Sequence, residues 1–101
     1  MTPSAAAQIA SLGKRLNEML RAPSPDPFAV AVTYSAFHAL LEIVLPEGGR
    51  RADLLAALQL EGDRLGIYTP GRPTPLPRPE RTAAAYTVER VTRKALSLVT
   101  V

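Results

Sequence analysis

A run of alternating prolines, Pro70 to Pro79, constrains this chain more than any other feature. Proline lacks an amide hydrogen, fixes its own φ and drives the preceding residue toward extended backbone. The run therefore predicts a stiff, extended arm at residues 70–80 rather than a helix or a central strand. At about 3.1 Å per residue, the run reaches roughly 30 Å, the width of a small domain. We expect the arm to separate a helical body, residues 1–69, from a C-terminal segment, residues 81–101.

The amino-acid composition favours an all-α protein with a single core. The chain has 101 residues, of which 47% are hydrophobic and only 5% aromatic. This balance fits helix packing better than a sandwich of aromatic-rich strands. The chain has no cysteine, which excludes a disulfide framework and a thiolate metal site.

Two further features of the composition bear on location and source. The N-terminus has no basic region followed by an apolar stretch. We therefore expect no secretory signal, and a location in the cytoplasm or in a particle assembled there. Ten prolines and few amide side chains also fit a thermophilic source.

Three segments of the body show apolar residues at helical spacing. The first is expected from about residue 3 to residue 21, with Thr2 as its N-cap. The second, residues 28–45, follows Asp26 as N-cap and is apolar on almost every side, which predicts a central helix buried all round. Its length is near that of a membrane span, but its polar residues and many alanines favour a core helix of a soluble protein.

Two more elements are expected, one on each side of the arm. A third helix should run from Arg51 to about Leu60, with Gly62 as its C-terminal glycine. Beyond the arm, Thr82 predicts the N-cap of a fourth helix, although a Thr- and Val-rich interior leaves a short strand at residues 96–101 open. The predicted fold is a small bundle of three helices with an extended arm and a C-terminal helix. That last element needs an apolar surface, on its own body or on a neighbouring copy.

The only cluster of potentially reactive side chains lies on the second helix, at Tyr34, Ser35, His38 and Glu42. His38 and Glu42 are four residues apart, so they share a helix face and are within reach of each other. A hydrolytic triad is not favoured, because groups on one helix face leave no oxyanion site opposite them. A metal ion would need further ligands. We interpret the four residues as a buried polar stripe that fixes the register of the bundle, and predict no catalytic, metal or cofactor site.

The glycine turn from Gly48 to Arg51 is a weak candidate for a phosphate contact. Free amides and two guanidiniums converge there. The turn lacks the Lys-Ser/Thr ending of a P-loop and a preceding strand, so we interpret it as a turn with solvated arginines. A helix-turn-helix over residues 51–68 is not favoured either, because its second helix would be too short to fill a major groove.

The net charge of +3 is unevenly distributed. Residues 1–69 carry six Lys and Arg against seven Asp and Glu, a balance of −1, whereas residues 70–101 carry six against two, a balance of +4. The six basic residues are Arg72, Arg78, Arg81, Arg90, Arg93 and Lys94. A basic tail suits contact with an acidic partner, with another copy of the chain or with the phosphates of a nucleic acid.

These observations favour a non-enzymatic structural protein that self-associates through its apolar helices and its proline-rich arm. Such a chain would serve as a coat, connector or scaffold subunit of a multi-copy particle such as a virion. The alternative is a small nucleic-acid-binding or regulatory protein that contacts phosphates through its basic C-terminal tail. The expected partners are copies of the same chain, with nucleic acid as the alternative and a membrane not favoured. No motif in the sequence identifies a family.

Overall fold

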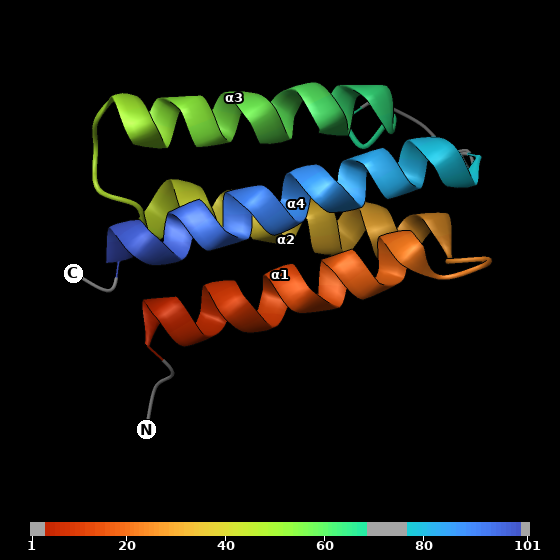
Figure 1. Ribbon diagram of the computed structural model, residues 1–101, viewed down its shortest axis with the longest axis horizontal. Helices are drawn as coiled ribbons and strands as arrows, with labels where there is room; N and C mark the ends of the chain where they lie inside the picture. The colour runs from red at the N-terminus through yellow and green to blue at the C-terminus, as the bar shows by residue number, and fades with distance from the viewer. Residues whose placement is uncertain (1–3, 69–76, 100–101) are drawn as a thin grey trace.

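Four helices make up the part of the chain that the computed structural model describes, residues 4–68 and 77–99. They are α1 (Ala5–Arg21), α2 (Pro27–Val44), α3 (Gly49–Arg64) and α4 (Arg78–Val99). Successive helices run in opposite directions, and α1 and α3 each pack against both α2 and α4 (Figure 1). Helices α2 and α4 therefore lie diagonally across an antiparallel four-helix bundle. The predicted all-α class is confirmed.

Side chains cap the N-termini of the first two helices. The Asp26 carboxylate accepts a hydrogen bond from the Phe28 amide at 3.0 Å, as the predicted N-cap of α2. The Ser4 hydroxyl accepts one from the Ala7 amide at 3.1 Å and caps α1. Each cap satisfies an amide that has no partner within the helix. The other predicted cap, Thr2, lies outside the described residues.

Helix α3 ends later than predicted, and a different glycine ends it. Gly66 has a φ of +72°, and the amides of Gly66 and Ile67 bond back to the carbonyls of Asp63 and Gly62. This pair of bonds is a Schellman motif, which requires the left-handed backbone that glycine adopts freely. The prediction that Gly62 ends the helix near Leu60 was wrong.

The C-terminal segment is a full member of the bundle. Helix α4 begins at Arg78, ahead of the predicted cap at Thr82. Pro79 lies in its first turn, where the missing proline amide would have no helical partner anyway. The prediction of an extended arm over residues 70–80 is therefore wrong from Arg78 onward, and residues 70–76 of the arm lie outside the described residues. The described part of the chain contains no strand, so the alternative of a terminal strand is wrong over residues 96–99.

Small side chains let α1 and α4 pack closely. These two helices form the most extensive helix pair in the described structure. The buried face of α4 consists mainly of alanine and valine: Ala84, Ala85, Val88, Val91 and Ala95. At Gly13 of α1, an added Cβ would collide with the Thr92 side chain of α4. The contact therefore depends on glycine because of packing and not because of its backbone freedom.

Helix α2 is not the buried central helix that its composition predicts. It buries one face, which includes Tyr34, Phe37 and Leu41, but it leaves Val32 and Ile43 on its opposite face largely in solvent. In a square of four helices each helix has two main neighbours, so one face of each is left outside. The prediction of a helix buried on nearly every face was wrong because the bundle has four members, not three around α2.

We expect Gly13→Ala to lower the free energy of unfolding by about 1–3 kcal/mol, because overpacking at Thr92 outweighs the gain in helix propensity of up to about 1 kcal/mol. Urea unfolding measures the change. The matched control is Gly49→Ala in α3, where nothing lies within 4 Å of the added Cβ. This control should keep or raise stability. A Gly13→Ala variant as stable as the Gly49→Ala variant would contradict the close-packing account.

Candidate functional site

The predicted polar stripe of α2 is only partly buried. Tyr34 is fully buried and the His38 side chain is 12% exposed, whereas the Glu42 side chain is 53% exposed and Ser35 lies in solvent. Each step of four residues turns the side chain by about 40° around a helix. Positions 34, 38 and 42 therefore drift from the core to the surface. The prediction of four buried positions was wrong for Ser35 and Glu42.

The inner part of the stripe forms a hydrogen-bonded network with a residue from α3's C-terminal turn. His38 Nε2 lies 3.1 Å from Glu42 Oε1, so the predicted contact is confirmed. His38 Nδ1 lies 2.7 Å from the Tyr68 hydroxyl. An ionised carboxylate only accepts hydrogen bonds, so a neutral imidazole donates from Nε2 to Glu42 and accepts at Nδ1 from Tyr68. Both ring nitrogens are occupied, which leaves neither for Ser35.

The packing at Gly62 positions Tyr68. A Cβ at Gly62 would collide with the Tyr68 ring, so the missing side chain makes the space that this ring fills. The rings of Tyr34 and Tyr68 meet edge to face, with centroids 6.3 Å apart. The Tyr34 hydroxyl donates to the Leu58 carbonyl at 2.5 Å. The hydrogen bonds of Tyr34 and His38 thus connect the buried side of α2 to α3 and to the turn after α3.

The electrostatics make Tyr68 a hydrogen-bond donor and not a nucleophile. Burial raises the pKa of Tyr68 to about 12, and the carboxylates of Asp63 and Glu42 add to the effect. Burial, followed by the nearby Tyr68, raises the pKa of the Tyr34 hydroxyl even further. A nucleophile is activated by a base or by a lowered pKa. In the described residues no group of three or more His, Asp or Glu side chains is placed to hold a metal ion.

Arg81, one of the predicted basic contact residues, is buried in the fold. Arg81 is 8% exposed. Its guanidinium donates to the carbonyls of Leu20 at 3.0 Å, Ala22 at 2.5 Å and Pro23 at 3.3 Å. These carbonyls lie at the C-terminal end of α1, where a cation also complements the helix dipole. Arg81 is therefore a cap for α1 and not a surface contact.

The other described basic residues of the tail are exposed. They are Arg78, Arg90, Arg93 and Lys94, all on α4. Arg72 lies outside the described residues. Lys94 lines a pocket shared with α3, and Arg93 lines a groove shared with α1. Exposed basic residues of α4 thus lie beside its contact with α3 and beside its contact with α1.

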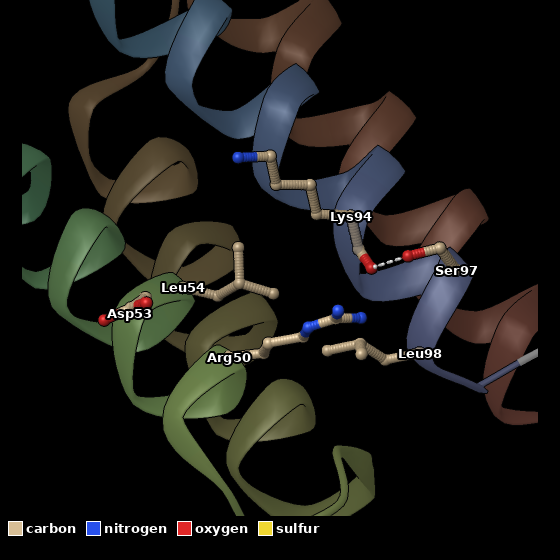
Figure 2. A pocket seen from close by; sticks show the side chains of 6 residues that line it. All are labelled: Arg50, Asp53, Leu54, Lys94, Ser97 and Leu98. Carbon is tan, nitrogen blue, oxygen red and sulfur yellow. Dashed lines mark hydrogen bonds between the residues drawn. The ribbon is translucent and has the colours of Figure 1, made fainter.

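The α3–α4 pocket has a volume of about 300 Å³ (Figure 2). It is lined by Arg50, Asp53 and Leu54 of α3 and by Lys94, Ser97 and Leu98 of α4. Figure 2 shows Arg50 extending from α3 toward α4. The Ser97 hydroxyl donates to the Lys94 carbonyl at 2.7 Å, which uses its proton within the helix. Leu54 and Leu98 supply apolar wall, and Arg50 and Lys94 supply positive charge.

The α1–α4 groove is wider, about 650 Å³, and its charges are largely matched. Its floor includes Gly13 and Thr92. Lys14 on its rim lies 4.0 Å from Glu18. Glu89 on the same rim lies 3.5 Å from Arg21. The acids of the groove thus have basic neighbours, and Arg93 is its one cation without an ion pair among the described residues.

The exposed apolar surface on α2 is the most unusual feature of the molecule. We name it the outer face of α2 and define it by Phe28, Val32, Ala36, Ala39 and Ile43, which are all exposed. Phe28, Val32 and Ile43 are 49%, 68% and 80% exposed. The helix has a mean hydropathy of 1.5, yet only 22% of its residues are buried. By length and composition alone α2 would also qualify as a membrane span, as core helices of soluble proteins often do.

Comparison with models of protein families, with curated proteins and with solved structures finds no match for this chain. Sequence reasoning found the His38–Glu42 contact because it follows from helix periodicity. The sequence pattern does not indicate the role of Tyr68, which lies 30 residues from His38, or that Arg50 of α3 and Lys94 of α4 line one pocket. The one local signal for Tyr68 is Gly62, whose missing side chain leaves space for the Tyr68 ring.

We expect stability to fall between pH 10 and pH 12 because of the buried tyrosines. Tyr68 ionises near pH 10 in an unfolded chain but near pH 12 in the folded one. Over this interval the unfolded state binds fewer protons, so the free energy of unfolding decreases as the pH rises. Tyr68→Phe should make this decrease shallower and should cost about 1 kcal/mol at pH 8 through the lost hydrogen bond.

Urea unfolding at pH 8, 10, 11 and 12 measures this dependence. The control is Tyr86→Phe, since Tyr86 is 62% exposed and should leave the alkaline slope unchanged. Equal slopes for the parent chain and the Tyr68→Phe variant would show that Tyr68 does not cause the loss of stability at high pH.

Proposed function

We propose that this chain is a non-enzymatic assembly protein that pairs with a second copy of itself through the outer face of α2. The observation that carries the proposal is the exposure of Phe28, Val32 and Ile43 on the most apolar helix of the bundle. A contiguous apolar surface on an otherwise well-packed bundle is typical of an interaction site. Scattered single exposed side chains would need no such explanation.

The order of residues along the outer face is self-complementary. In an antiparallel pair with a two-fold axis between residues 37 and 38, Val32 faces the partner's Ile43. In the same pair Ala36 faces the partner's Ala39. The two alanine pairs at the centre allow close approach of the helices. The larger Val32–Ile43 pairs fill the contact at both of its ends. Because a two-fold interface requires each patch to match itself, this order favours a second copy as the occupant.

The charge distribution on α2 also favours a second copy over a membrane surface or a polyanion. The helix has no Lys or Arg, and Glu42 is its only formally charged side chain. Helices that lie on membranes combine an apolar face with a basic polar face, which α2 lacks. Glu42 contacts His38 at the edge of the face, so no like charges would meet at the centre of the pair.

The expected strength of this dimer is modest. Burying the exposed parts of four large side chains, Val32 and Ile43 of each copy, contributes roughly 4–8 kcal/mol, and the loss of free motion costs about 4–15 kcal/mol. A standard interface buries about 800 Å² per partner, which one pair of 18-residue helices does not reach. We therefore expect a reversible dimer, populated at roughly 10–1000 μM protein. As part of a larger coat, connector or scaffold, many weak contacts of this kind would add together.

The nucleic-acid alternative concerns a different side of the bundle. Arg90, Arg93 and Lys94 lie on α4, which is diagonal to α2. None of these three side chains forms an ion pair within the described structure. Contact with phosphates through α4 would therefore be compatible with pairing through α2.

Replacing both Val32 and Ile43 with lysine should abolish the dimer, because the two substitutions place four positive charges in a dry contact. Light scattering coupled to size exclusion at several hundred micromolar protein measures the mass. Both positions are exposed, so circular dichroism should show an intact helical fold. Leu60→Lys is the control, since Leu60 is an equally large side chain on α3 that is 54% exposed. A parent chain that stays monomeric at these concentrations, or a double variant that still pairs, would overturn the proposal.

Cross-linking tests the antiparallel geometry directly, because the chain has no cysteine of its own. A Val32→Cys, Ile43→Cys double variant should form covalent dimers with a short bis-maleimide. Val32→Cys alone should not, since two copies of residue 32 would lie about 16 Å apart along the helix axis. Efficient cross-linking of the single variant would instead indicate a parallel pair.

A further inference from the structure

We propose that the pocket between α3 and α4 binds a phosphate group. The pocket shares no residue with the outer face of α2, so this inference is independent of pairing. It begins with the two cations that line the cavity, Arg50 and Lys94. They come from positions far apart in the sequence and line one cavity because α3 and α4 pack side by side. In Figure 2 the Arg50 guanidinium extends toward Leu98, and the Lys94 ammonium points away from it, past Leu54.

Neither cation has a counter-ion among the residues that the structure describes. The ion pairs of the described residues involve Lys14, Arg21, His38 and Arg64, and not Arg50 or Lys94. Asp53 lines the same cavity but lies beyond ion-pair distance of both. Both charges would attract an anion that enters the cavity.

The residue types match phosphate. A guanidinium presents a planar fork of donors that fits two phosphate oxygens, and an ammonium adds a compact point charge. The Ser97 oxygen already donates to the Lys94 carbonyl, so it is left as an acceptor for a protonated phosphate oxygen or a ligand hydroxyl. Leu54 and Leu98 provide apolar wall for the organic group that carries the phosphate.

The size of the cavity limits the ligand. A volume of about 300 Å³ is at the lower end of the range for small-molecule sites. It admits one phosphate with a small organic group and is too small to enclose a dinucleotide. Two sources share this chemistry: a free phosphate monoester, and a single backbone phosphate of a nucleic acid lying along α4.

Substituting Asp53 tests the proposal, because the substitution should strengthen phosphate binding rather than weaken it. Asp53 is one of the lining residues and has no ion-pair partner among the described residues, so its negative charge disfavours a bound phosphate. Asp53→Asn removes that repulsion with little change in shape and should tighten binding several-fold. A substitution that merely loosened the structure would weaken binding instead.

The experiment is a titration of the full chain with phenyl phosphate and, separately, with a short single-stranded DNA, followed by amide NMR shifts and calorimetry. Arg50→Gln and Lys94→Gln should each weaken binding about tenfold. Both side chains are exposed, so these variants should keep the fold, which circular dichroism checks. The matched control is Arg90→Gln, an exposed cation of α4 that does not line the pocket. It should leave the affinity for phenyl phosphate unchanged.

The two ligands separate the two sources. Binding of phenyl phosphate that depends on Arg50 and Lys94 supports the site with a free monoester as ligand. Binding of DNA alone, with the same dependence on both residues, supports the site with a backbone phosphate as ligand. The proposal is overturned if neither ligand binds, if Arg90→Gln weakens the affinity for phenyl phosphate as much as Lys94→Gln, or if Asp53→Asn fails to strengthen binding.

Discussion

The close packing of α1 against α4 is the contact on which the rest of this bundle depends. Gly13 gives the Thr92 side chain the space it occupies, and Asn17 donates to the Ala85 carbonyl at 2.7 Å across the same seam. Arg81 closes one end of the seam by capping α1. Because α4 packs against α1 and α3, diagonally across from α2, it does not cover α2, and no described residue covers the outer face of α2. The exposed apolar surface of α2 is thus a consequence of how α4 packs.

Local rules predicted the parts of this structure that depend on local sequence. The Asp26 cap and the His38–Glu42 contact follow from spacing along one helix, and the all-α class follows from composition. The errors concern tertiary contacts. The sequence predicts a helix end at Gly62 because it does not show that the Tyr68 ring packs there. It predicts a surface cation at Arg81 because the carbonyls that Arg81 caps lie about 60 residues away in the chain.

The two proposed surfaces lie on different sides of the bundle and differ in chemistry. The outer face of α2 is apolar and almost uncharged, while the pocket between α3 and α4 is lined by the two cations Arg50 and Lys94. Desolvation favours contacts on the first surface, and long-range attraction favours contacts on the second. Salt weakens the second kind of contact and not the first. Under the two proposals, the chain would have two contacts that can be adjusted separately without a second domain.

The capping of α1 by Arg81 also sets an order of events during synthesis. A ribosome makes α1, α2 and α3 before it reaches the residue that satisfies the last carbonyls of α1. Until then the buried side of α1, including Leu16 and Leu20, has no α4 to cover it. Domains dominated by contacts between distant residues close late, and exposed apolar surface on nascent chains is prone to aggregate. A product that terminated before Arg81 would therefore keep the apolar side of α1 exposed to chaperones and proteases. In the full chain α4 covers that side.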